Sequence, residues 1–151
     1  MRLQSSGFPD GGTIPSKYTH KGGNFSPPLA WADAPKKTKS FALIVDDPDA
    51  PNGSFVHWLV YNIPANQSKL EEGTPHSKEL DGGVRQGRNN FGDIGYDGPE
   101  PPSGTHRYRF HLFALDSKIE LPSGAERGRI DSELRQHTIG ECELVGKYAR
   151  S

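Results

Sequence analysis

The segment Arg-Tyr-Arg-Phe-His-Leu-Phe-Ala-Leu at residues 107–115 is the stretch that decides the fold class. Its apolar side chains recur at every second position on one face, at Tyr108, Phe110, Leu112 and Ala114. The other face carries Arg107, Arg109, His111 and Phe113. Because successive side chains of a strand point to opposite sides, this two-residue period predicts a central antiparallel strand.

Three other segments predict further strands. Ser40–Val45 is apolar after its first residue and stops at two aspartates and a proline, which indicates a buried strand. Phe55–Ile63 predicts a second strand, closed by Pro64. Ile139–Tyr148 alternates apolar and acidic residues, a pattern that suits a closing strand with one face in water.

The composition favours an all-β chain with many turns. The 151 residues include 18 Gly and 13 Pro, and only 32% are hydrophobic, which favours turns and surface connections over long helices. One short amphipathic helix is predicted over residues 126–136, where Ile130 and Leu134 lie four positions apart. The length suits a single domain over residues 1–151. Residues 70–104 show almost no periodicity, so this long connection is either held in place or disordered.

The charge pattern argues against several classes of partner. Eighteen Lys and Arg residues stand against 19 Asp and Glu, a formal net charge of −1, so no basic field is available to hold nucleic acid or an anionic membrane. No stretch approaches the roughly 20 apolar residues of a membrane span. The first six residues lack the apolar run of a signal peptide, and the lone Cys142 cannot form an internal disulfide. We therefore expect a cytoplasmic protein that neither binds nucleic acid nor inserts into membranes.

Residues 46–51, Asp-Asp-Pro-Asp-Ala-Pro, form the first candidate site segment. Each proline fixes its own φ and forces the preceding residue, Asp47 or Ala50, out of the helical region. The acidic side chains are therefore displayed by a stiff backbone, which favours a functional site. A plain strand-ending turn, made soluble by its acids, is the alternative interpretation.

Two histidines in strand-like segments are further candidates. His57 lies within the apolar run 55–61, where a lone histidine is more often a core or surface residue than a ligand. His106 and Tyr108 are two residues apart, so they share one face of a strand while Arg107 points the other way. That face presents an imidazole and a phenol together. Alternatively, Tyr108 begins the core stripe and His106 caps it.

Taken together, these segments resemble the phosphatidylethanolamine-binding protein family, and most of all its bacterial and archaeal Raf-kinase-inhibitor-like branch. The resemblance spans Phe8–Tyr148 and rests on the order and spacing of the motifs. The main motifs are Asp47-Pro48-Asp49-Ala50-Pro51, His57-Trp58, Gly98-Pro99, Pro101-Pro102 and His106-Arg107-Tyr108. Supporting motifs lie at residues 26–31, 86–92, 113–116 and 144–148.

The resemblance implies a sandwich-like fold of two antiparallel sheets with one or two short peripheral helices. It also implies a small anion pocket lined by Asp47, His57, His106 and Tyr108, with one wall formed by Gly98, Pro99, Pro101 and Pro102, and with Asp49 at its rim or beneath it. Family members of this kind accept phosphate, phosphoryl-ethanolamine, acetate or cacodylate-like groups there. Bacterial relatives often pair as homodimers, so a homodimer is also expected.

An anion needs hydrogen-bond donors, and the predicted pocket offers His57, His106, the Tyr108 hydroxyl and loop amides. An ionised Asp47 can only accept a hydrogen bond. We expect it to orient one of the histidines and to raise the proton affinity of that imidazole. Alternatively, Asp47 binds a ligand ammonium or a protonated phosphate oxygen.

Two other function classes stay open. The first is a protein that regulates or inhibits a partner, a kinase or a protease, through surface loops such as residues 70–92. Asn52-Gly53-Ser54 stands where the eukaryotic kinase regulators usually show Ser-Arg, and the chain ends soon after Tyr148, without their extra C-terminal helix, which argues against kinase inhibition.

The second class is an unrecognised hydrolase or lyase that uses Asp47 and His57 as general acid and base. The sequence contains no G-x-S-x-G, H-E-x-x-H or C-x-x-C motif. We therefore predict a binding protein with no catalytic residue, no metal site and no cofactor.

Overall fold

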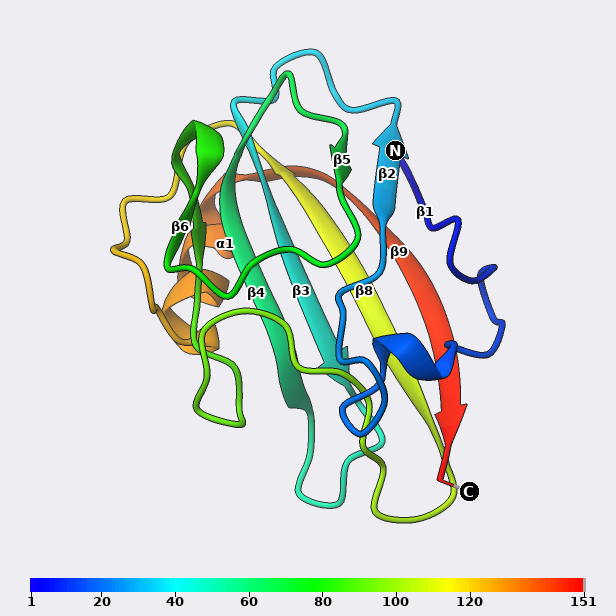
Figure 1. Ribbon diagram of the computed structural model, residues 1–151. Helices are drawn as coiled ribbons and strands as arrows, with labels where there is room; N and C mark the ends of the chain where they lie inside the picture. Colours follow the sequence, from blue (N-terminus) through cyan, green and yellow to red (C-terminus); the bar gives the residue numbers. More distant parts are fainter. Residues whose placement is uncertain (151) are drawn as a thin grey trace.

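Strand β3 lies in the middle of a six-stranded antiparallel sheet in the computed structural model, which describes residues 1–150. Every predicted strand belongs to this sheet, and the predicted helix is present as α1 (Arg127–His137). The all-β prediction is therefore confirmed. In order across the sheet (Figure 1), the strands are β6 (Glu79–Leu80), β7 (Val84–Gln86), β4 (Phe55–Pro64), β3 (Ser40–Asp47), β8 (Thr105–Leu115) and β9 (Thr138–Ala149).

A second, smaller antiparallel sheet and the helix α1 pack on opposite faces of the six-stranded sheet. The small sheet has the order β1 (Arg2–Gln4), β2 (Leu29–Ala32) and β5 (Lys69–Leu70). Two 3₁₀ turns, η1 (Ser16–Tyr18) and η2 (Asp81–Gly83), lie in the connections. The two-sheet architecture agrees with the fold that the resemblance implies.

The two faces of β3 belong to two different cores. Phe41, Leu43 and Val45 pack between the two sheets, whereas Ala42 and Ile44 pack beneath α1. Alternation therefore continues beyond the apolar run: Asp47 follows Val45 on the face toward the small sheet, and Asp46 follows Ile44 on the helix face. Two adjacent aspartates thus serve two separate parts of the molecule.

The long connection over residues 70–104 is held in place by buried polar side chains. Gln86 is completely buried, and its amide nitrogen donates to the carbonyl oxygens of Pro75 and Ser77 at 2.7 and 2.8 Å. Its amide oxygen accepts the indole N–H of Trp58 at 2.7 Å. Each of these hydrogen bonds pairs a donor or acceptor that burial would otherwise leave without a partner. The connection is therefore held in place and is not disordered.

Candidate functional site

The candidate site forms where β3 ends and β8 begins. Asp47 is the last residue of β3, and His106 is the second residue of β8. The two side chains are buried, and the Nδ1 of His106 donates to Oδ2 of Asp47 at 2.5 Å. The other carboxylate oxygen, Oδ1, accepts the backbone N–H of Asp49 at 2.8 Å. Asp47 therefore orients the ring of His106 with one carboxylate oxygen. With the other oxygen it fixes the backbone of the proline-rich turn that follows.

A β-bulge brings His57 to the same place. Val45 pairs with Trp58 but the next residue, Asp46, pairs with Val56, so β4 carries one extra residue, His57, at this point. The His57 ring packs edge-on against Tyr108 with centroids 5.3 Å apart. Its Nδ1 lies 2.6 Å from the carbonyl oxygen of Asp97. Burial lowers the pKa of His57 below its ordinary 6.5, although the Asp97 carbonyl and nearby carboxylates act in the opposite direction.

Tyr108 supplies a buried hydroxyl without a hydrogen-bond partner among the described residues. The side chain is 1% exposed, and the Asp47 carboxylate and the backbone of Glu100 are the polar groups that act on its hydroxyl. Burial, followed by the charge of Asp47, raises the pKa of Tyr108, so the phenol is neutral. An unpaired buried hydroxyl is costly and uncommon in a folded protein.

A cavity of about 660 Å³ opens in front of these residues. Asp47 and His57 line it directly, and its mouth is formed by the turn at residues 50–55, by Asn90 and Phe91, and by Glu100 and Pro102. The structure therefore brings Asp47, His57, His106 and Tyr108 into one group, with His106 and Tyr108 in contact with the two side chains that line the cavity.

Four of the other predicted site residues lie outside this cavity. Pro99 and Pro101 line a neighbouring hollow of about 190 Å³. Gly98 packs against the N-terminal segment, where a Cβ would lie 2.1 Å from the carbonyl oxygen of Tyr18, so only glycine fits. Asp49 turns away and accepts hydrogen bonds from the backbone N–H, Nε and Nη2 of Arg107 at 2.8 to 3.0 Å. Of the expected wall, only Pro102 lines the cavity.

The sequence gives no sign of Asp97 and Asn24, which support His57 from behind, whereas their partner Asn89 belongs to the supporting motif at residues 86–92. The carboxylate of Asp97 accepts the side-chain amides of Asn24 at 3.0 Å and Asn89 at 2.9 Å. Burial alone would raise the pKa of Asp97, but these hydrogen bonds outweigh it and hold the pKa below its usual value. Phe91 was also missed as a pocket wall; it packs edge-on against His57 at 5.5 Å. The only local signal was the Asn89-Asn90 pair in a turn that glycines flank.

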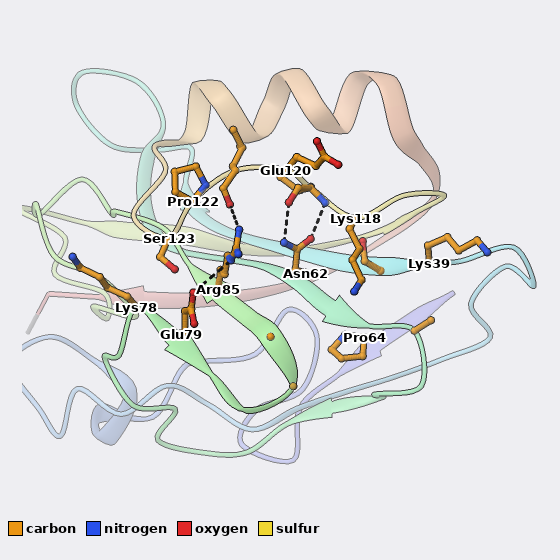
Figure 2. A pocket seen from close by; sticks show the side chains of 16 residues that line it. Lys39, Asn62, Pro64, Lys78, Glu79, Arg85, Lys118, Glu120, Pro122 and Ser123 are labelled. Carbon is orange, nitrogen blue, oxygen red and sulfur yellow. Dashed lines mark hydrogen bonds and ion pairs between the residues drawn. The ribbon is translucent and has the colours of Figure 1, made fainter.

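A larger cleft of about 1100 Å³ lies at the opposite end of the β3–β4 hairpin (Figure 2). Its polar floor is already occupied by structural bonds. Asn62 clamps Ile119 through both the backbone N–H and the carbonyl, at 2.7 and 2.9 Å, and Arg85 donates to the carbonyl oxygen of Leu121 at 2.6 Å. The cleft is therefore a weaker candidate for a ligand site than the cavity at Asp47.

Residues 1–150 contain neither a membrane-spanning helix nor a cluster of metal-ligating side chains. No helix there is long and apolar enough to cross a membrane. No group of three or more His, Cys, Asp or Glu side chains is arranged to hold a metal ion within the same residues.

The fold and the cavity define a class of protein: a β-sandwich with a polar cavity at one end of its central strands. Comparison with known proteins gives the family. The family model described as phosphatidylethanolamine-binding protein matches residues 4–149. A UPF0098 protein of Methanothermobacter thermautotrophicus is 47% identical over 150 residues, covering 99% of each chain. A UPF0098 protein of Aquifex aeolicus is 43% identical over 153 residues, covering 99% of this chain and 89% of its own.

Solved structures agree with the sequence relatives. Escherichia coli YbcL, described as a new member of the mammalian phosphatidylethanolamine-binding protein family, superposes with a TM-score of 0.93 at 34% identity, covering 99% of this chain and 98% of its own. CT736 of Chlamydia trachomatis, described as a putative phosphatidylethanolamine-binding protein homologue, superposes with a TM-score of 0.90 at 37% identity. The match covers 99% of this chain and 97% of CT736. The chain belongs to the phosphatidylethanolamine-binding protein family.

Proposed function

We propose that this protein binds a small phosphate-bearing or related anionic ligand in the cavity at Asp47 and His57, and that binding there regulates a partner protein. The observation that carries the proposal is the cavity of about 660 Å³ that Asp47 and His57 line, with the side chain of Asp47 held by His106 at 2.5 Å. Family membership supports the same site, because Asp47, Pro51, His57 and Pro102 from the motifs that carry the resemblance line the cavity.

The proposal is tested by titrating the protein with inorganic phosphate and with phosphoryl-ethanolamine while recording amide and histidine NMR shifts. We expect shifts that cluster at Asp47, His57, His106 and Tyr108 and that are lost in His106→Ala. His111→Ala is the matched control, because His111 lies on the opposite face of the same strand. An absence of shifts at millimolar ligand would mean that the cavity is not a phosphate site.

A second candidate function is the inhibition of a kinase or a protease through the surface at the far cleft. Lys39, Lys78 and Lys118 surround that cleft (Figure 2), and none of them forms an ion pair within residues 1–150. Unpaired cations on a rim suit an acidic partner surface. Inhibition of a purified enzyme that persists in saturating phosphate but is lost in Lys78→Glu would favour this role over the cavity. The expected homodimer and the cytoplasmic location stay predictions.

A further inference from the structure

The protonation of His57 is set by the backbone behind it. A carbonyl oxygen can only accept, so the Nδ1 that lies 2.6 Å from the Asp97 carbonyl must carry the ring proton. In the neutral ring, Nε2 is then an unprotonated nitrogen with a lone pair, since the hydrogen bond of the ring within residues 1–150 is made through Nδ1. His57 therefore offers the cavity an acceptor, whereas an anion site ordinarily offers donors.

Several other polar groups that line the cavity also accept. Asp47 and Glu100 are carboxylates, and Glu100 is paired at the rim with His20 at 2.7 Å and Lys21 at 3.9 Å. The hydroxyl of Ser54 donates to Asp46 at 2.7 Å and accepts Nη1 of Arg127 at 3.3 Å, which leaves one lone pair. The side-chain donors are the amides of Asn52 and Asn90; the Oδ1 of Asn90 accepts the N–H of Val56 at 2.7 Å, which leaves its Nδ2 to donate.

This balance of acceptors over donors is unfavourable for a bare oxyanion. An oxygen that carries no hydrogen would face the lone pair of His57 and the charge of Asp47 in a partly enclosed, low-dielectric space. An oxygen that carries a hydrogen would donate to His57 Nε2 and leave its neighbouring oxygens for the Asn90 amide. A ligand that brings its own proton therefore matches the cavity.

We propose that the cavity selects oxyanions that still carry a proton, such as hydrogen phosphate, over oxyanions of the same shape that carry none, such as sulfate, with His57 Nε2 as the acceptor that discriminates them. This inference rests on the proposed function of the cavity and specifies its ligand class. Sulfate and phosphate have the same tetrahedral shape, so shape complementarity cannot replace the hydrogen bond as the source of the preference.

The surroundings of His57 keep Nε2 unprotonated in the relevant pH range. Asp47 from β3 and the neutral Tyr108 from β8 lie beside the ring, Asp97 lies behind it, and the charge of Asp46 acts on it from the opposite face of β3. The three carboxylates favour a second ring proton, but burial opposes it more strongly, and the pKa of His57 is lowered as a result. Because the pKa lies below 6.5, the ring of His57 is neutral at neutral pH and at the pH of the test below.

The test compares inorganic phosphate with sulfate at about pH 8, where both are mainly dianions and only phosphate carries a proton. Calorimetric titration at constant ionic strength gives the two affinities. We expect phosphate to bind at least about tenfold more tightly than sulfate. Sulfate leaves the His57 Nε2 acceptor without a hydrogen bond, and such a loss weakens binding by about that factor or more. Ethanolamine is titrated as a third probe, because its ammonium brings protons without an oxyanion.

Two variants assign the preference to its source. His57→Gln replaces the fixed acceptor by an amide that can also donate, so the phosphate preference should fall at least about fivefold. Glu100→Gln removes a carboxylate at the partly exposed rim, where folding is not at risk, and should strengthen sulfate binding. His111→Gln, on the opposite face of β8, is the control and should keep the wild-type ratio. Thermal unfolding checks that each variant is folded.

The possible outcomes separate the inference from the proposed function. Equal binding of phosphate and sulfate would overturn the inference and leave the anion site in place. A preference that persists unchanged in folded His57→Gln would also overturn it. Binding of neither anion, or binding of ethanolamine alone, would overturn both the inference and the proposed function.

Discussion

His57 owes its place in the cavity to one extra residue in β4. Without the bulge between Val56 and Trp58, strict alternation would turn His57 away from the face that holds Trp58 and Tyr108. The sequence shows a histidine in an apolar run but does not show the bulge, because a bulge depends on the partner strand. The pairing with β3 therefore converts an ordinary strand histidine into a residue that lines the cavity.

The buried His57 should make stability depend on pH. The unfolded chain protonates this ring as the pH falls below about 6.5, whereas burial makes the folded protein resist that proton. The unfolded state then binds more protons, so the free energy of unfolding decreases as the pH falls from about 6.5. We expect His57→Gln to show a smaller decrease than the wild type in denaturant titrations at a series of pH values. The same slope in both proteins would contradict the assignment.

NMR can observe the tautomer of the same residue directly. The bond to the Asp97 carbonyl predicts that neutral His57 carries its proton on Nδ1. The ¹⁵N shifts of the ring should therefore identify Nδ1 as protonated and Nε2 as bare, with a titration midpoint below 6.5. A proton on Nε2 at neutral pH would contradict both the geometry at Asp97 and the ligand class inferred from it.

At the level of elements, Asp46 joins helix α1 to the sheet. Its buried carboxylate accepts from Arg109 of β8 at 3.0 Å and from Arg127, the first residue of α1, at 2.7 Å. Burial alone would raise the pKa of Asp46, but hydrogen bonds from Arg109, Ser54 and Arg127 outweigh it and hold the pKa below the ordinary 3.8. This contribution to stability is present above pH 3.8 and is lost as the pH falls further.

We predict that Asp46→Asn lowers the free energy of unfolding by about 3 kcal/mol, near the lower end for a broken buried ion pair, because both arginines are about one-third exposed. Asp49→Asn is the matched control. Asp49 has a pKa of about 2 because of its hydrogen bonds with Arg107, but the pair lies at the surface and should contribute clearly less. Equal losses in denaturant titrations would show that Asp46 does not tie the helix to the sheet.

Over the whole molecule, stability should be highest in the central strands and lowest at the mouth of the cavity. Strand β3 is hydrogen-bonded on both sides, to β4 and to β8, whereas the mouth at residues 50–55 and 100–102 lies almost entirely outside strands and helices. Native-state hydrogen exchange should therefore be at least about tenfold slower in β3 than at the mouth. Comparable protection in both regions would mean that the cavity is as rigid as the core.

The sequence by itself determined the class of fold, and it predicted four polar residues, Asp47, His57, His106 and Tyr108, that the fold brings into contact. Period-two alternation in residues 107–115 and the apolar run ending at Asp46-Asp47 are local patterns, and burial of one face of a strand requires no knowledge of its neighbours. The same alternation placed His106 and Tyr108 on one face, which the structure confirms.

Tertiary structure alone decided which side chains face the cavity and what each can donate or accept. Asp49, Gly98, Pro99 and Pro101 belong to the same motifs as the site, yet contacts with Arg107 and with the N-terminal segment draw Asp49 and Gly98 away. The proton position on His57 depends on the Asp97 carbonyl, 40 residues away in the chain. Hydrogen-bond partners distant in sequence leave no local pattern, and for that reason the chemistry of the cavity could be read only from the folded chain.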